Sequence, residues 1–117
     1  MEEDAEYLKL PLEDRCVHKL WKARLHGYEE CIKYFPTITD EKSPEFSKFA
    51  ALMKKFVMDS NAVAQEKALE AVLVFAENAH IAPRTATDVA SGIVAKALGG
   101  ARRGTLEKAE AVLLMYC

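Results

Sequence analysis

The 117-residue sequence has little proline and glycine, with four prolines and five glycines, and it has no long apolar run. A collagen-like or disordered chain is excluded, because 50% of the residues are hydrophobic. A membrane-spanning helix needs roughly 18 apolar residues in succession, and no segment comes near that length. The acidic start, Met1-Glu2-Glu3-Asp4, lacks the basic and apolar regions of a signal peptide. We therefore expect one soluble intracellular domain with no membrane partner.

Charge and cysteine content also exclude several classes of function. The formal net charge is −2, which gives no reason to expect a nucleic-acid binder. Three cysteines, an odd number, indicate a reducing compartment. The spacing of Cys16, His18, His26 and Cys31 matches no common zinc site, and both Cys31 and Cys117 fit small apolar core positions. Glycine-rich phosphate loops and G-x-S-x-G motifs are missing as well, so we expect no metal, no cofactor and no enzyme.

The apolar residues recur at helical spacing, and no alternating pattern predicts a strand. Ser43 with Pro44 predicts a capped helix start, and Gly99-Gly100 predicts a helix end. Thr85 with Asp88 resembles a capping box, and Thr105 is expected to cap the last helix. The expected helices cover residues 11–18, 21–35, 44–58, 62–79, 85–98 and 106–117.

An internal repeat of forty residues organises these helices. Glu70-Ala-Val-Leu73 recurs as Glu110-Ala-Val-Leu113, and Glu30 lies a further forty residues upstream, followed by a small and then a β-branched residue. Two helices per forty residues are typical of HEAT-type α-solenoids. The sequence therefore predicts an all-α fold, with an acidic leader over residues 1–10 and three HEAT-type repeats over residues 11–36, 44–79 and 85–117.

A solenoid places the turns inside its repeats along one edge, where binding residues tend to lie. These turns carry Trp21 with Lys19 and Lys22, then Ser60 with Asn61, then Arg102 with Arg103. The net-acidic chain is thus expected to have a locally basic edge with one exposed aromatic side chain. Such an edge would suit an acidic protein surface, because charge sets orientation and an aromatic side chain supplies an anchor.

Several motifs in this order resemble the start of the first TOG domain in the Mini spindles and chTOG family of microtubule polymerases. The resemblance extends to about Leu98, and it rests on residues 10–15, 17–24, 40–49, 59–65 and 77–80. It implies a paddle-shaped array of HEAT repeats whose loop edge binds free, curved αβ-tubulin. The family's domain has six repeats, so the chain resembles the half of one TOG domain that faces β-tubulin.

The resemblance also implies which residues touch tubulin and where the protein acts. Trp21 would pack on β-tubulin with Lys22 beside it, and the second and third turns would add contacts. The implied location is the cytoplasmic cytoskeleton, at microtubules, the spindle and the spindle poles or centrosome. The implied tubulin-binding residues are Trp21, Lys22, Ser60, Asn61, Ala62, Val63, Arg102 and Arg103.

Other interpretations remain open at this point. Trp21 begins an apolar helix face and would also suit the core. Arg24 would suit an internal salt bridge as well as a tubulin contact. Asn61 could simply cap a helix. The alternative function is a HEAT-type adaptor that binds a protein other than tubulin. The last helix, residues 106–117, has apolar residues that no following repeat covers, which predicts marginal stability or self-association through that end.

Overall fold

The computed structural model describes residues 6–97 and 103–116, and no strand occurs in this part of the chain. The elements are η1 (Glu6–Lys9), α2 (Leu12–Arg15), α3 (Trp21–Tyr34), η2 (Phe35–Thr37), α4 (Pro44–Ala50), α5 (Met53–Val57), α6 (Ala62–Asn78), η3 (Ala82–Thr85), α7 (Ala86–Gly92), the π-helical turn η4 (Ile93–Ala97) and α8 (Arg103–Tyr116).

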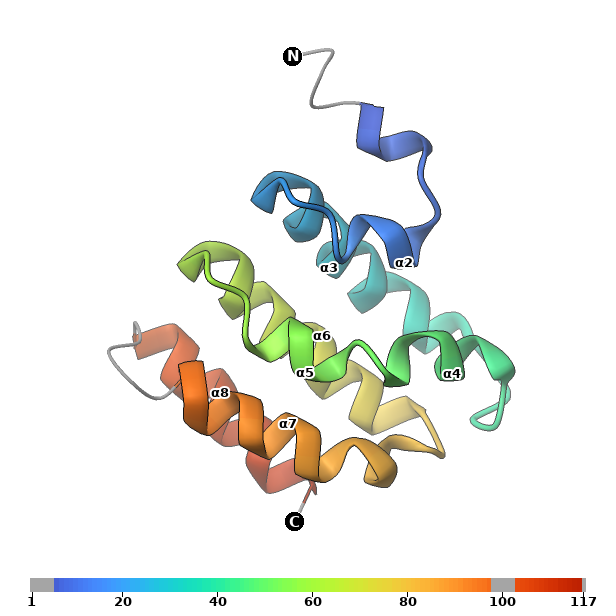
Figure 1. Cartoon of the computed structure of the whole chain (residues 1–117). Helices are drawn as coiled ribbons and strands as arrows, with labels where there is room; N and C mark the ends of the chain where they lie inside the picture. Colours follow the sequence, from blue (N-terminus) through green and yellow to red (C-terminus); the bar gives the residue numbers. More distant parts are fainter. Residues whose placement is uncertain (1–5, 98–102, 117) are drawn as a thin grey trace.

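The helices form two layers (Figure 1). Helices α3, α6 and α8 pack side by side in one layer, and α2, α4, α5 and α7 form the other. The stack is flat, with extents of 42 × 37 × 18 Å. Each repeat thus contributes one helix or helix pair to each layer and packs on its neighbour, as in HEAT solenoids. The predicted all-α solenoid fold is confirmed.

An aromatic cluster joins the first two repeats at the C-terminal ends of α3 and α6. The ring of Phe35 lies 5.1 Å from that of Phe49 and 5.7 Å from that of Phe75, and the rings of Phe46 and Phe75 are 5.9 Å apart. All four side chains are buried. Aromatic pairs at such distances add to the free energy of area burial, so this end of the stack fixes how α3 and α6 lie relative to each other.

The segment 44–58, which the periodicity predicts as one helix, is two helices in the structure. Helices α4 and α5 are separated by a turn at Ala51–Leu52, where the Leu52 N–H donates to the Phe49 carbonyl at 2.9 Å. The two parts have different neighbours, since α4 meets η3 while α5 packs between α6 and α7. Tertiary packing therefore overrides the uninterrupted helical pattern.

Two expected helix caps are wrong. The Thr85 hydroxyl donates to the Ala82 carbonyl at 2.7 Å inside η3 and lies 2.6 Å from the Tyr116 hydroxyl, so it does not cap α7. Thr105 lies inside α8, because this helix begins at Arg103. The Thr105 hydroxyl is buried and has no hydrogen-bond partner among the described residues. The predicted stop at Gly99 and Gly100 lies outside the described residues.

Helix α2 approaches α3 closely and so positions the turn between them. A Cβ on Gly27 would lie only 2.8 Å from the Cys16 sulfur and 3.0 Å from the Cys16 nitrogen. The Cys16 and Cys31 sulfur atoms are 3.6 Å apart, and both side chains are buried. The predicted core position of Cys31 is confirmed, and Cys117 lies outside the described residues.

Candidate functional site

The N-terminal ends of α3, α6 and α8 lie along one edge of the stack, on the left of Figure 1. We call residues 17–22 and 58–63, together with Arg103, the turn edge. The first two turns inside the repeats lie on this edge, as the solenoid prediction expects. Arg102 lies outside the described residues. Arg103 is the first residue of α8, and its side chain is also outside the description.

Trp21 is the first residue of α3 and the aromatic side chain of the turn edge. It is half-buried and packs against the hydrophobic core. The Lys22 ammonium group lies 5.9 Å from the centre of its ring, within the range of a cation–π interaction. Val17 and Leu20, next to it in the chain, are 42% and 40% exposed. Trp21 therefore combines partial core packing with a surface position beside other exposed apolar groups.

The second turn is fixed by its own side chains. The Asn61 side-chain oxygen accepts the Ala64 N–H at 3.0 Å and caps α6, so the capping interpretation of Asn61 is confirmed. The Gln65 side-chain amide donates to the Val57 carbonyl at 3.0 Å, which ties α6 back to the end of α5. The three other residues predicted to bind here, Ser60, Ala62 and Val63, are all exposed.

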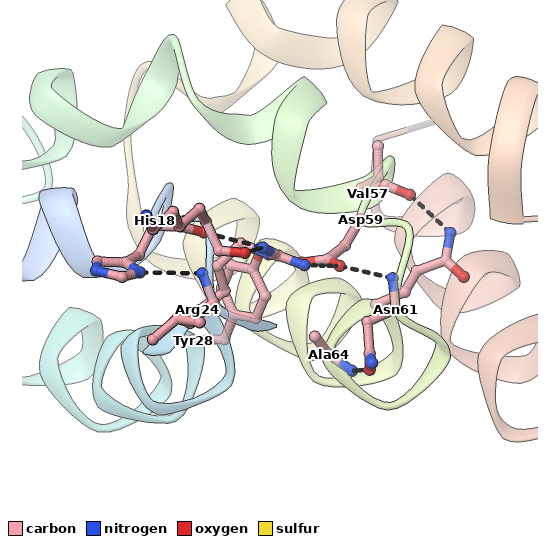
Figure 2. A network of polar contacts seen from close by, with 10 residues as sticks. His18, Arg24, Tyr28, Val57, Asp59, Asn61 and Ala64 are labelled. Atoms are coloured by element: carbon pink, nitrogen blue, oxygen red, sulfur yellow. Dashed lines mark hydrogen bonds and ion pairs between the residues drawn. The ribbon is translucent and has the colours of Figure 1, made fainter. Parts of the chain in front are cut away.

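A buried ion pair joins the two turns (Figure 2). The Arg24 guanidinium donates to both Asp59 carboxylate oxygens, at 2.7 Å from Nε and 2.9 Å from Nη2. Its Nη1 donates to the carbonyls of His18 and Lys19, at 2.9 and 3.1 Å. Planar two-point pairing of this kind fixes geometry as well as supplying energy. The residues just before Trp21 are thereby tied to the second turn.

Asp59 is the centre of this arrangement. Besides Arg24, it accepts the Tyr28 hydroxyl at 2.7 Å and the Asn61 backbone N–H at 2.9 Å. Burial raises the pKa of Asp59, but the hydrogen bonds from Arg24 and Tyr28 outweigh burial and lower it overall. Burial and the bond to Asp59 raise the pKa of Tyr28. The carboxylate is therefore ionised and fully satisfied, and it acts as a structural group.

The structure thus shows what Arg24 does, which the sequence left open. Arg24 forms an internal salt bridge with Asp59, so the internal salt bridge expected as one of its two roles is confirmed. The two residues are 35 positions apart, and neither local spacing nor helical periodicity connects them. The only local signal was that an acidic residue preceded the Ser60-Asn61 turn.

The described residues show neither of two other kinds of site. No helix among them is long and apolar enough to cross a membrane. They also contain no group of three or more histidine, cysteine, aspartate or glutamate side chains placed to hold a metal ion.

Comparisons with known proteins match nearly the whole chain to one family of domains. Residues 6–117 match the family described as XMAP215/Dis1/CLASP, TOG domain. The chain is 60% identical to the protein Mini spindles of Drosophila melanogaster over 116 residues, which are 99% of this chain and 6% of that protein. It is 43% identical to Protein MOR1 of Arabidopsis thaliana over 112 residues, 95% of this chain and 6% of that protein.

A third relative is the spindle pole body component alp14 of Schizosaccharomyces pombe, which is 38% identical over 121 residues. That match covers 97% of this chain and 15% of the relative. The chain thus spans a small part of each of these proteins, while the family match covers nearly all of the chain. The chain belongs to the XMAP215/Dis1/CLASP family of TOG domains.

Proposed function

We propose that the chain is a non-catalytic module that captures free αβ-tubulin through its turn edge, mainly on the β-tubulin side. As part of a microtubule-associated protein it would promote plus-end polymerisation and spindle assembly by concentrating tubulin. Membership of the TOG-domain family supports this proposal. The names of the relatives support a place at the cytoplasmic cytoskeleton, since one is a spindle pole body component and another is Centrosomal protein 224 of Dictyostelium discoideum.

The observation that carries the proposal is the ion pair between Arg24 and Asp59. It holds two turns from different repeats in one arrangement before any partner binds. A surface that is already ordered loses less conformational entropy on binding, which favours affinity. The proposed contacts on this surface are Trp21, Lys22, Ser60, Asn61, Ala62, Val63, Arg102 and Arg103.

The two arginines of the third turn are proposed to steer tubulin toward the edge. Replacing both Arg102 and Arg103 with alanine is expected to slow association more than it speeds dissociation, because exposed charges act mainly on the encounter. The defect is expected to shrink as salt rises, since mobile ions screen exposed charges. Stopped-flow binding at several ionic strengths measures both rates, and a defect independent of salt would contradict the steering role.

The alternative function is an adaptor that binds a different protein through the same edge. Sedimentation velocity of the chain mixed with unpolymerised αβ-tubulin separates the two. Tubulin capture is expected to move the chain into a faster boundary together with tubulin. Independent boundaries at all concentrations would leave the adaptor function as the better interpretation.

The end of the stack formed by η4 and α8 has exposed apolar side chains, which relates to the expected self-association. Val94, Leu114 and Met115 are 67%, 69% and 43% exposed, and they lie on η4 and on the last turns of α8. Exposed apolar side chains of this kind favour association, so we propose that the isolated chain self-associates through this end. In sedimentation equilibrium, its weight-average mass is expected to rise with concentration. In Leu114→Lys that mass is expected to stay closer to the mass of the monomer. A concentration-independent monomer would contradict the proposal.

A further inference from the structure

A pocket opens on the turn edge between the first two turns. It has a volume of about 250 Å³, and both turns contribute to it. Arg24, Tyr28 and Asp59 line it, and they also belong to the network in Figure 2. The remaining lining residues are Cys16, Val17, His18, Lys19, Lys55 and Ser60.

The charge lining this pocket is mostly positive. Its one carboxylate among the described lining residues, Asp59, is already bound by Arg24, Tyr28 and the Asn61 backbone N–H. It therefore forms no ion pair with the two lysines of the lining, Lys19 and Lys55. Lys19 and Lys55 are exposed, and no carboxylate of the described residues forms an ion pair with either ammonium group. The pocket therefore has two ammonium groups that are not neutralised from within the described part of the chain.

Two other pockets in the described part of the chain differ from this one in the charge of their lining. These pockets, of about 170 and 270 Å³, are lined by residues of α3 and α6, and the smaller one also by Lys108 of α8. Both carry glutamate side chains beside their lysines. Glu29 lines both of them. Lysines at those sites can find a carboxylate close by, whereas those of the turn-edge pocket cannot. Of these three pockets, the one at the turn edge is therefore the one that favours an anionic group of a binding partner.

The remaining groups of the turn-edge pocket suit a carboxylate on a short apolar stem. Ser60 has an exposed hydroxyl that can donate a hydrogen bond, while Val17 offers an apolar wall. A volume of 250 Å³ has room for such a side chain together with some of its water, since one water occupies about 30 Å³. Lys19 and Trp21 both belong to the turn edge, so one partner surface can reach the pocket and the Trp21 ring together.

We propose that this pocket receives an aspartate or glutamate side chain of the bound tubulin, held between Lys19 and Lys55. This inference rests on the proposed tubulin capture and adds a specific subsite to it. The ion pair between Arg24 and Asp59 holds the backbone of the two turns together, so the segments that carry Lys19 and Lys55 stay on either side of the pocket. Charge-assisted bonds of this kind are stronger than neutral ones.

A matched pair of charge reversals tests the pocket. Lys55→Glu places a carboxylate in the pocket, whereas Lys54→Glu makes the same change in net charge on the adjacent exposed residue, outside it. Binding to unpolymerised αβ-tubulin is expected to weaken about tenfold in Lys55→Glu and less than about twofold in Lys54→Glu. Lys55→Arg is expected to keep most of the affinity because it keeps the charge.

A zero-length carbodiimide cross-link provides the second measurement, because it joins an ammonium group to a carboxylate only where the two are in contact. Mass spectrometry of the wild-type complex is expected to find Lys55 or Lys19 joined to a tubulin acidic residue, and Lys54 unjoined. If Lys55→Glu and Lys54→Glu lose equal affinity for tubulin, and neither Lys55 nor Lys19 is cross-linked, the pocket does not bind a tubulin carboxylate. The proposed tubulin capture would still hold in that case. Failure of the wild-type chain to bind tubulin would overturn the proposed function, and the pocket with it.

Discussion

Replacing Arg24 with methionine is expected to lower the free energy of unfolding by about 3 kcal/mol, because the Asp59 carboxylate then stays buried without its cation. The Asp59 side chain is 0% exposed and that of Arg24 is 16% exposed, so water cannot replace the lost partner well. The variant also loses the bonds from Arg24 to the carbonyls of His18 and Lys19. Urea denaturation followed by circular dichroism measures the change.

Lys48→Met is the matched control, since it also removes a cation from an ion pair on the same molecule. The Lys48–Glu45 pair is 3.1 Å long, but its side chains are 50% and 39% exposed. Exposed pairs contribute little because both ions remain hydrated, so this variant is expected to leave the unfolding free energy nearly unchanged. Equal destabilisation by the two substitutions would contradict the structural role given to the buried pair.

The difference between Arg24→Met and the wild type is also expected to depend on pH. Asp59 has a lowered pKa in the folded chain, so its stabilising contribution is complete above the pKa of an unfolded aspartate, about 3.9. That contribution is lost as the pH falls through the lowered folded value. In Arg24→Met the same carboxylate is buried without its cation, so it takes up a proton more readily than in the wild type. The difference in unfolding free energy between wild type and variant is therefore expected to narrow as the pH falls, and a difference that widens on acidification would contradict this assignment.

Trp21→Ala is expected to weaken tubulin binding by about 2 kcal/mol, or roughly thirtyfold, because aromatic anchors dominate interfaces of this kind. Trp21 is half-buried at the turn edge with exposed apolar neighbours, so a partner surface can complete its burial. Isothermal titration against unpolymerised tubulin measures the affinity. Wild-type affinity in a folded variant would remove Trp21 from the interface.

Some folding stability will be lost in Trp21→Ala as well, since the ring packs against the core. Tyr34→Ala controls for that loss, because it removes a half-buried ring from the opposite end of the same helix, roughly 20 Å away. It is expected to destabilise the chain while leaving tubulin affinity unchanged. Equal loss of affinity in both variants would indicate that Trp21 acts through stability alone.

Local patterns in the sequence were sufficient for helices α3 and α6 and for the turns that precede them. The spacing of apolar residues predicted α3 and α6 to within one residue of their observed ends, because each buries one continuous face. Asn61 was a recognisable cap, because its side chain acts on a backbone group three residues away. The forty-residue repeat then placed the first two turns on one edge.

Interactions between distant segments could not be predicted in the same way. The partner of Arg24 depends on how two repeats pack, and a single sequence carries no signal that links positions 24 and 59. The break at Ala51–Leu52 and the bond from Thr85 to Ala82 also depend on neighbours that meet only in the folded chain. The pocket between the turns was missed for the same reason, because Lys55 and Lys19 belong to different repeats.

Amide hydrogen exchange of the chain with and without unpolymerised αβ-tubulin is the measurement that tests capture by the turn edge most directly. We expect tubulin to slow exchange in residues 17–22 and 58–63, which form the turn edge. We expect no change in residues 35–43 and 79–85, which connect the helices at the opposite edge. Protection confined to the opposite edge, or no protection at either edge with tubulin in excess, would contradict capture through the turns.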